Sequence, residues 1–149
     1  MSSPFVSRSA QLADADASWD RNGLERLSRE RCLVLLRTAR IGRLGYGMDG
    51  VPAVVPVNIA TDAAAVVFRL STGRALAAIE ARQLVVVEVD EVNLDACCGW
   101  SINVIGVAAE VPAALVDGLS DVPTTWARGD HGRVFRLPLT VVEGRRLAS

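Results

Sequence analysis

Apolar residues recur with helical spacing over residues 27–39, LSRERCLVLLRTA. The residues that follow the i, i+3, i+4, i+7 spacing of one helix face are Cys32, Leu35, Leu36 and Ala39. Ser28 precedes them, and a serine there can accept a hydrogen bond from the first helical N–H groups. The pattern predicts an amphipathic helix that packs its apolar face on a core.

The next stretch, residues 41–60, predicts a β-hairpin. Asp49-Gly50 is a turn signal between two extended segments. Pro52 and Pro56 cannot donate to a ladder, so the second strand is expected at a sheet edge or with a bulge. Such a strand, presenting Asn58, could leave backbone groups free for a ligand.

The remaining pattern alternates short strands with few helices. We expect strands at 64–70, 84–92, 99–111 and one or two within 134–147, short helices at 73–83 and 112–119, and a loop at 123–133. A parallel doubly wound sheet needs more helices between its strands. The sequence therefore predicts a mainly β fold, with about six antiparallel strands closed into a small barrel and short α-helices.

The chain has 149 residues, half of them hydrophobic, which fits one domain with a real core. We expect residues 1–23 to form a polar N-terminal arm, disordered or lying over a partner, and residues 24–149 to form the folded domain. The sequence shows neither a signal-peptide core nor a long uncharged apolar segment. A cytoplasmic protein without a membrane partner is expected.

The charges balance, with 16 basic and 17 acidic residues, and every basic residue is arginine. This balance disfavours a general nucleic-acid or membrane-surface binder. Three Phe, one Tyr and three Trp also offer few stacking platforms for an RNA-binding barrel. An anion site in this chain must use arginine, backbone N–H groups or hydroxyls.

Metal and acid–base chemistry find little support in the sequence. Three cysteines, two of them adjacent, do not form a disulfide framework and indicate a reducing compartment. With one histidine and no CxxC motif, no metal site is expected. His131 is expected in an exposed loop, and Asp90 and Glu91, being adjacent in a strand, point to opposite faces. No catalytic residue is identified.

The segment VVFRLSTGRALAAIE, residues 66–80, has the order strand, glycine turn, helix. Ser71 and Thr72 can donate hydroxyl hydrogen bonds, and the N–H groups of Gly73 and Arg74 open the helix, where its dipole favours an anion. Arg69 or Arg74 could place a guanidinium fork on a phosphate. Alternatively, the turn only caps a short helix and both arginines face solvent.

Several motifs in order give the chain a family resemblance. DGVPAVVPVNIA, VVFRLSTG, VVVEVDEV, GWSINVIGVAAEV and LTVVEGRRL together resemble the pyridoxamine 5′-phosphate oxidase-like, FMN-binding split-barrel family, in particular its small actinobacterial members. The resemblance covers roughly residues 24–147. It implies a six-stranded antiparallel split barrel, and a homodimer with flavin sites at the subunit interface.

The resemblance also implies site residues. The strand VPVN, with Val57 and Asn58, would lie beside the isoalloxazine ring, and residues 68–75 would bind the ribityl and phosphate groups. Trp100 and Ser101 would approach the flavin from the partner subunit or border it. Packing in the core or an interface is an alternative for Trp100. A buried strand asparagine bonded to backbone is an alternative for Asn58.

Among the chain's departures from the family pattern, three bear on the cofactor site. Where related proteins read close to FRTAPGTKL, this chain reads FRLSTGRAL, so the customary lysine falls on Ala75 and the customary threonine on Arg74. The usual Tyr or His after the asparagine of PVN is Ile59. The sequence therefore leaves open whether Arg69 or Arg74 supplies the missing cation.

Two functions follow as hypotheses. The first is a flavin-dependent oxidoreductase that acts on a small molecule and uses FMN or a deazaflavin, the cofactor carrying the hydride chemistry. The second is a non-catalytic split-barrel dimer whose cofactor binding is weak or lost. The true pyridoxamine phosphate oxidase reaction is disfavoured, because no set of basic groups for a substrate phosphate is identified.

Overall fold

The computed structural model describes residues 18–124 and 132–148. Its strands are β1 (Ser18–Trp19), β2 (Glu25–Leu27), β3 (Ile41–Met48), β4 (Val51–Thr61), β5 (Ala65–Leu70), β6 (Val85–Asn93), β7 (Cys98–Gly106), β8 (Ala109–Glu110), β9 (Arg133–Pro138) and β10 (Val141–Leu147). Its helices are α2 (Arg29–Thr38), α3 (Arg74–Glu80) and α4 (Ala113–Val116). His131 lies outside the described residues.

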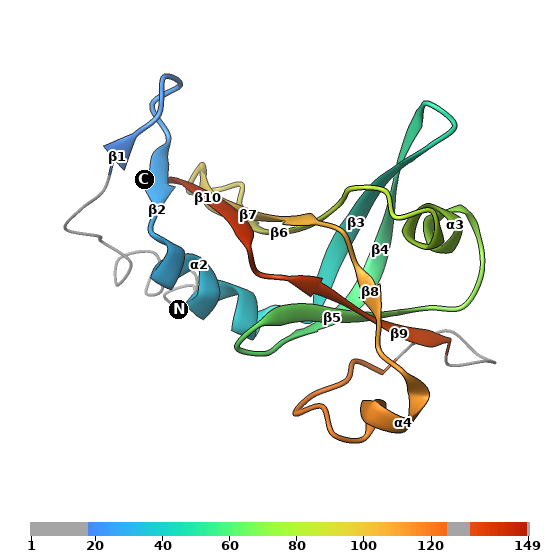
Figure 1. The fold of residues 1–149 in the computed structure, drawn as a ribbon. Helices are drawn as coiled ribbons and strands as arrows, with labels where there is room; N and C mark the ends of the chain where they lie inside the picture. Colours follow the sequence, from blue (N-terminus) through green and yellow to red (C-terminus); the bar gives the residue numbers. More distant parts are fainter. Residues whose placement is uncertain (1–17, 125–131, 149) are drawn as a thin grey trace.

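The strands form one antiparallel sheet in the order β1-β2-β10-β7-β6-β3-β4-β5-β9-β8. The sheet curls so that β7 and β9 pack against each other without pairing, which gives a split barrel (Figure 1). The predicted mainly β, antiparallel class is therefore confirmed.

The strand count differs from the prediction of about six, because the sheet holds ten strands among the described residues. Three of them, β1, β2 and β8, have only two or three residues. The strand expected at 99–111 is divided, because β7 pairs with β6 and β10 whereas β8 pairs with β9. The chain crosses between these partners at Ala108, which is buried.

The β3–β4 hairpin forms as predicted. Asp49 and Gly50 both have positive φ, 53° and 75°, which is the geometry of a tight hairpin turn. β4 lies inside the sheet order, yet it pairs with β3 along residues 51–58 and with β5 only along 59–61. Pro52 and Pro56 thus lie where β4 has a strand on one side only. The predicted edge position is correct locally.

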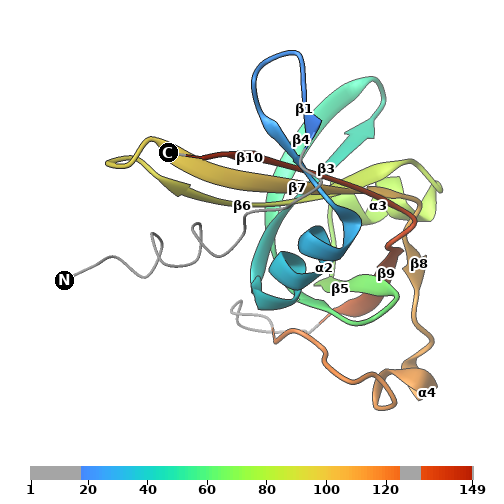
Figure 2. The ribbon, with the colours of Figure 1, turned by 90° about the vertical axis from the view of Figure 1, so that its left-hand side faces the viewer.

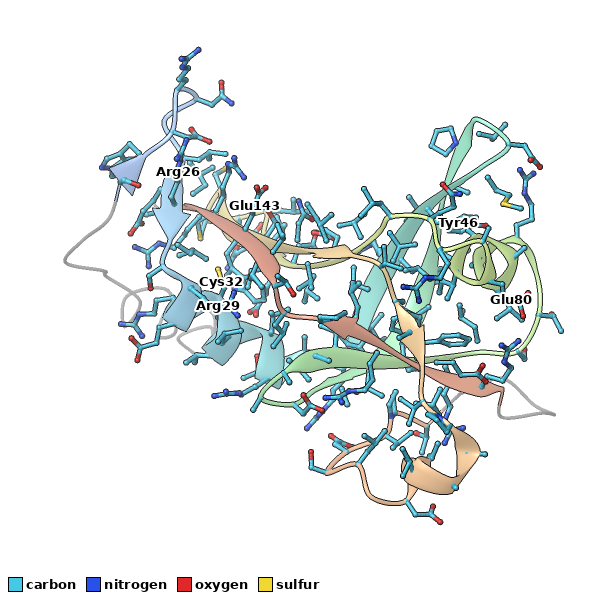
Figure 3. All side chains as sticks on the ribbon, in the orientation of Figure 1. Arg26, Arg29, Cys32, Tyr46, Glu80 and Glu143 are labelled. Carbon is cyan, nitrogen blue, oxygen red and sulfur yellow. The ribbon has the colours of Figure 1, made fainter. Side chains whose placement is uncertain are left out.

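Helix α2 covers one open end of the barrel (Figure 2). Ser28 caps it by accepting a hydrogen bond from the Arg31 N–H at 3.3 Å, and Cys32, Leu35 and Leu36 are buried. Figure 3 shows Cys32 between the helix and β10. A Cβ on Gly144 of β10 would lie 2.4 Å from the Cys32 Sγ, so only glycine allows this approach. None of the described helices is long and apolar enough to span a membrane.

The core fills the space between the curled sheet and α2. Its largest fully buried side chains include Phe68, Phe135, Leu36 and Ile102. The Phe68 and Phe135 rings stack with centroids 6.0 Å apart across the β5–β9 pair. β5, buried on both sides over residues 65–68, therefore brings its C-terminal end, Arg69 and Leu70, out of the core at a defined place.

A short N-terminal hairpin, β1–β2, joins the sheet beside β10. Within it, the Asp20 carboxylate accepts hydrogen bonds from the Asn22 and Leu24 N–H groups and from Arg145 Nε. The buried Glu25 carboxylate accepts from Arg146 Nε at 2.7 Å. Of the arm expected at residues 1–23, residues 18–23 belong to this hairpin, and residues 1–17 lie outside the described residues.

Candidate functional site

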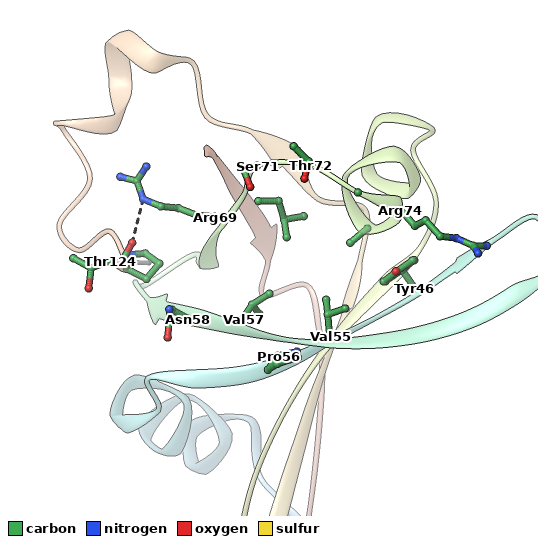
Figure 4. A pocket seen from close by; sticks show the side chains of 14 residues that line it. Tyr46, Val55, Pro56, Val57, Asn58, Arg69, Ser71, Thr72, Arg74 and Thr124 are labelled. Carbon is green, nitrogen blue, oxygen red and sulfur yellow. Dashed lines mark hydrogen bonds between the residues drawn. The ribbon is translucent and has the colours of Figure 1, made fainter. Parts of the chain in front are cut away.

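The site is a pocket of about 340 Å³ at the place where β4 separates from β5, beside the start of α3 (Figure 4). Its lining residues come from four parts of the chain: Tyr46, Val55, Pro56, Val57, Asn58, Arg69, Leu70, Ser71, Thr72, Gly73, Arg74, Ala75, Pro123 and Thr124. It brings together seven of the nine predicted site residues.

β4 forms the floor of the pocket. Because its residues 51–58 pair with β3 alone, the backbone on the β5 side has no strand partner among the described residues. Val55 and Val57 point into the pocket, whereas the Asn58 side chain leaves the strand on the opposite face (Figure 4). Asn58 also borders a neighbouring hollow lined by Arg40 and Asp121. The floor therefore offers apolar side chains and exposed backbone.

The turn after β5 supplies hydroxyl groups. Ser71 and Thr72 are exposed, and neither side chain makes a hydrogen bond within the described part of the chain. Gly73 is the N-cap of α3, with φ +100°, and no side chain caps that helix. The turn therefore caps α3 through Gly73, and neither the serine nor the threonine hydroxyl takes part in that cap. Both hydroxyls stay available to a ligand.

The two candidate arginines lie on opposite sides of these hydroxyls (Figure 4). Arg69 is half-buried, and its Nε donates to the Pro123 carbonyl at 3.1 Å while Nη1 donates to the Gly132 carbonyl at 3.4 Å. Arg74 is exposed, and its Nη2 donates to the Met48 carbonyl at 3.2 Å. Arg69 is engaged with the wall of the pocket, whereas Arg74 lies at its rim.

The charge of the pocket is positive. No aspartate or glutamate is among the described residues that line it, and both charged residues are arginines. Ala75, at the position where the family resemblance leads us to expect a cation, is 6% exposed and packs in the core. The positive charge thus comes from the sides of the pocket and not from residue 75.

Trp100 and Ser101 do not reach this pocket within one chain. They line a second hollow of about 410 Å³, which also contains Leu24, Val92 and Arg146. β7 is separated from β4 by β6 and β3, and Trp100 pairs with Glu91, beyond the part of β6 that contacts β3. Trp100 is 7% exposed and packs in the core, as the packing alternative stated. Their approach to a partner's site stays a prediction.

The sequence did not indicate three residues of the pocket. Pro123 and Thr124 form one wall, although they follow Thr72 by about fifty positions. Tyr46 stands beside Arg74 at the other end (Figure 4). As the chain's single tyrosine, in a strand that ends in an Asp-Gly turn, Tyr46 was a detectable signal. No local pattern connects Pro123 with β4.

The carboxylates outside the pocket form a separate cluster. Arg43 Nη1 lies 3.2 Å from Glu88 and 2.9 Å from Asp90 on the outer face of the sheet. Partial burial and the nearby Asp90 charge raise the pKa of Glu88. Within the described residues no group of three or more metal-ligating side chains occurs, and all three cysteines are free. This cluster is a structural ion pair on the sheet surface.

Comparison with known proteins agrees with this architecture. A family profile described as pyridoxamine 5′-phosphate oxidase matches residues 28–146. No curated protein shows a significant match.

Three solved structures share the fold closely. An FAD-binding protein from Mycobacterium smegmatis is 25% identical, with a TM-score of 0.61, covering 84% of this chain and 99% of that one. An FAD-binding protein from Mesorhizobium loti is 26% identical, with a TM-score of 0.69 and coverages of 84% and 99%. A conserved protein of unknown function from Corynebacterium diphtheriae is 26% identical, with a TM-score of 0.66 and coverages of 84% and 98%. The profile match spans most of the chain, and this protein therefore belongs to the pyridoxamine 5′-phosphate oxidase family.

Proposed function

We propose that the β4–β5–α3 pocket binds a flavin nucleotide and that the protein is a flavin-dependent oxidoreductase acting on a small molecule. One observation carries the proposal: the two segments that the family resemblance assigns to the flavin, 55–58 and 68–75, both contribute to one pocket whose described lining contains no acidic residue. The volume of about 340 Å³ lies within the usual range for small-molecule pockets, about 300–1,000 Å³.

The residues present fit a flavin phosphate. The Ser71 and Thr72 hydroxyls have no hydrogen-bond partner among the described residues, and Gly73 presents no Cβ to an approaching ligand. Hydroxyl and guanidinium donors are the groups that hold phosphate oxygens in proteins. Arg74 at the rim can add a charge-assisted hydrogen bond. The turn therefore has the donor set that a phosphate requires.

The β4 floor fits a flat aromatic ring. Val55 and Val57 give it apolar contact, and the backbone of residues 51–58 on the β5 side is free of strand pairing within the described chain. Backbone groups of that kind can fix the orientation of ring carbonyls and ring N–H groups. A bound flavin would supply the hydride transfer, while the chain binds and orients the ring and limits its contact with water.

The relatives support a flavin and leave its form to experiment. The Mycobacterium smegmatis and Mesorhizobium loti structures, 25% and 26% identical, are FAD-binding proteins. FMN and FAD share the ribityl group and the first phosphate, and a deazaflavin nucleotide shares the same chain. The proposal therefore concerns that shared part, and FMN, the smallest phosphorylated form, is the first ligand to test.

A second candidate function is a split barrel with weak or lost cofactor binding. Two observations favour it: Ala75 carries no charge where a lysine is expected, and the Arg69 guanidinium already donates to two backbone carbonyls. The difference from the first function is quantitative. One missing charge-assisted hydrogen bond costs about 1.5–3 kcal/mol, or roughly 10- to 100-fold in affinity.

Titration of the purified protein separates the two functions. FMN, FAD and a deazaflavin nucleotide are added in turn, and quenching of ligand fluorescence and the melting temperature are recorded. A flavin that binds only the folded state raises the melting temperature as its concentration increases. Oxidation of reduced nicotinamide by the loaded protein then tests the oxidoreductase role. Absence of both quenching and thermal stabilisation with every flavin would contradict the first function.

The same proposal includes a homodimer. The outer face of the sheet carries an apolar row formed by cross-strand neighbours: Val54, Val86, Ile105 and Val141, with Gly45 between the first two. Val54 is 65% exposed and Val141 is 45% exposed. A contiguous apolar row on a central sheet favours a protein partner over solvent. A second copy of the chain would cover it.

A further inference from the structure

Arg69 lies at the boundary between the β5 strand and the pocket, and its sequence position suggested a phosphate ligand. We infer that Arg69 is instead a positioning residue, which locks the Pro123–Thr124 wall of the pocket against the Ser71 turn. Only the expected effect on flavin affinity rests on the proposed function. The contacts of Arg69 with the pocket wall exist in the chain without a ligand.

The side chain of Arg69 joins two distant parts of the chain. Its Nε donates to the Pro123 carbonyl at 3.1 Å, and its Nη1 donates to the Gly132 carbonyl at 3.4 Å. These carbonyls lie 54 and 63 positions beyond Arg69 along the chain, so one planar guanidinium joins two separate places to the end of β5. Pro123 is buried and lines the pocket. The rigid fork of arginine suits this double contact, whereas the single ammonium of lysine does not.

The backbone of Gly132 makes an independent contact to the Ser71 turn. It has φ +70°, and a Cβ built on it would lie 2.7 Å from the Leu70 carbonyl carbon and oxygen and 2.9 Å from the Ser71 nitrogen. The backbone of Gly132 therefore packs directly on the peptide unit that leads into the Ser71 turn. Any other residue would have to displace backbone atoms. The Arg69 guanidinium thus links Pro123 to Gly132, and Gly132 in turn packs on the hydroxyl-bearing turn.

This arrangement gives Arg69 and Arg74 different roles. For Arg69 to grip an anion, it would have to withdraw from carbonyls on the half-buried side of the pocket, which would lose hydrogen bonds already made. Figure 4 shows its guanidinium directed away from Ser71 and Thr72. Arg74, exposed at the opposite rim, can reorient at little cost. Arg74 therefore supplies the charge that binds the phosphate, and Arg69 maintains the shape of the pocket that accepts the flavin.

Dissociation constants for FMN and for riboflavin, which lacks the phosphate, distinguish these roles. In R69K and in G132A, both constants should rise together, on the order of ten-fold, with their ratio unchanged. In the matched variant R74M, the constant for FMN should rise on the order of ten-fold while that for riboflavin stays as in the unsubstituted protein. Loss of affinity for FMN alone in R69K would overturn the inference, because it would make Arg69 a phosphate ligand.

A measurement without flavin keeps the test independent of the proposed function. Amide hydrogen exchange of the ligand-free protein is followed in peptides covering residues 116–124 and 68–76. Exchange in both peptides should accelerate in R69K and G132A but not in R74M, because only the first two release the wall. Unchanged exchange in R69K would overturn the inference. If the unsubstituted protein bound no flavin, the proposed function would fail while this measurement still decided the role of Arg69.

Discussion

Ser71 and Thr72 show what individual hydroxyl side chains contribute to the site. Their hydroxyls are exposed on the pocket and make no hydrogen bond within the described chain, so the fold does not use them. A ligand can therefore gain their hydrogen bonds without breaking any in the protein. If these hydroxyls capped a helix, each would have to break a hydrogen bond within the protein before it could bind a ligand.

Replacing both hydroxyls should weaken phosphate-bearing flavins and leave the fold intact. In the double variant S71A/T72A we expect the dissociation constant for FMN to rise roughly 10- to 100-fold, since hydrogen bonds to a charged group are lost. The melting temperature without ligand should stay unchanged. Fluorescence titration and thermal unfolding measure the two quantities. A large fall in melting temperature without ligand would show that the hydroxyls support the fold instead.

Cys32 predicts a pH dependence of stability. Burial raises the pKa of its thiol from about 9 to about 11. The unfolded chain therefore releases this proton at lower pH than the folded chain, so the free energy of unfolding is fully retained below pH 9 and falls as the pH rises toward 11. The loss over that window is about 2–3 kcal/mol.

The variant C32A tests this dependence. It should lack the additional decline above pH 9, whatever its stability at neutral pH, because Cys97 and Cys98 remain in both proteins. Urea unfolding at several pH values gives the two curves. Parallel curves between pH 9 and 11 would contradict a buried thiol with a raised pKa.

At the scale of elements, the contact between α2 and β10 depends on one missing side chain. Gly144 faces Cys32 and Leu27, and a Cβ there would approach the Cys32 Sγ to 2.4 Å and the Leu27 Cβ to 3.1 Å. The helix covers the open end of the barrel, so this close approach closes the core. The sequence predicted the apolar face of the helix, but it did not predict which strand this face packs against.

Adding one methyl at Gly144 should therefore destabilise the fold. We expect G144A to lower the free energy of unfolding by about 1–3 kcal/mol through overpacking. The control G47A should change it little, since a Cβ on Gly47 meets nothing within 4 Å. Combining G144A with C32A should recover part of the loss, because the obstructing sulfur is gone. Equal effects of G144A and G47A would contradict the tight contact.

The N-terminal hairpin is attached to the sheet by a buried ion pair. Glu25 is 3% exposed and Arg146 is 7% exposed, and Arg146 Nε donates to the Glu25 carboxylate at 2.7 Å. Removing one partner leaves an uncompensated buried charge. We expect E25A to lower the free energy of unfolding by about 3–5 kcal/mol. Urea unfolding measures this change.

The exposed pair Arg40–Asp121 offers a matched control. Its side chains are 69% and 55% exposed, so R40A should cost between about 0 and 1 kcal/mol. A comparable small effect of E25A would show that the hairpin contributes little to the stability of the barrel.

At the scale of the whole molecule, the apolar row on the outer sheet face predicts the oligomeric state. Light scattering of the unsubstituted protein should give the mass of a dimer. V54E should shift the mass toward that of a monomer, because a charge would be buried in the interface. The control V34E, at an exposed position of α2 away from the sheet face, should leave the dimer intact. A monomeric unsubstituted protein would contradict the proposal.

The sequence by itself determined the main elements, because local periodicity and turn chemistry fix them. The helix face of Cys32, the Asp49-Gly50 turn and the Ser71–Gly73 segment all follow from residues near each other in the chain. The mainly β, antiparallel class followed from their order. The family resemblance added the expectation that residues 55–58 and 69–74 share a site, and the structure places them in one pocket.

Only the tertiary structure decided the roles of the side chains in that pocket. The division of β7 from β8, the wall formed by Pro123, and the engagement of Arg69 with that wall all depend on partners far away in the sequence. Hydrogen bonds of this kind follow from the curl of the sheet, which no local pattern specifies. Trp100, for the same reason, lies in a different hollow from Ser71. Local pattern thus identified the donors, and long-range packing determined which of them remain available to a ligand.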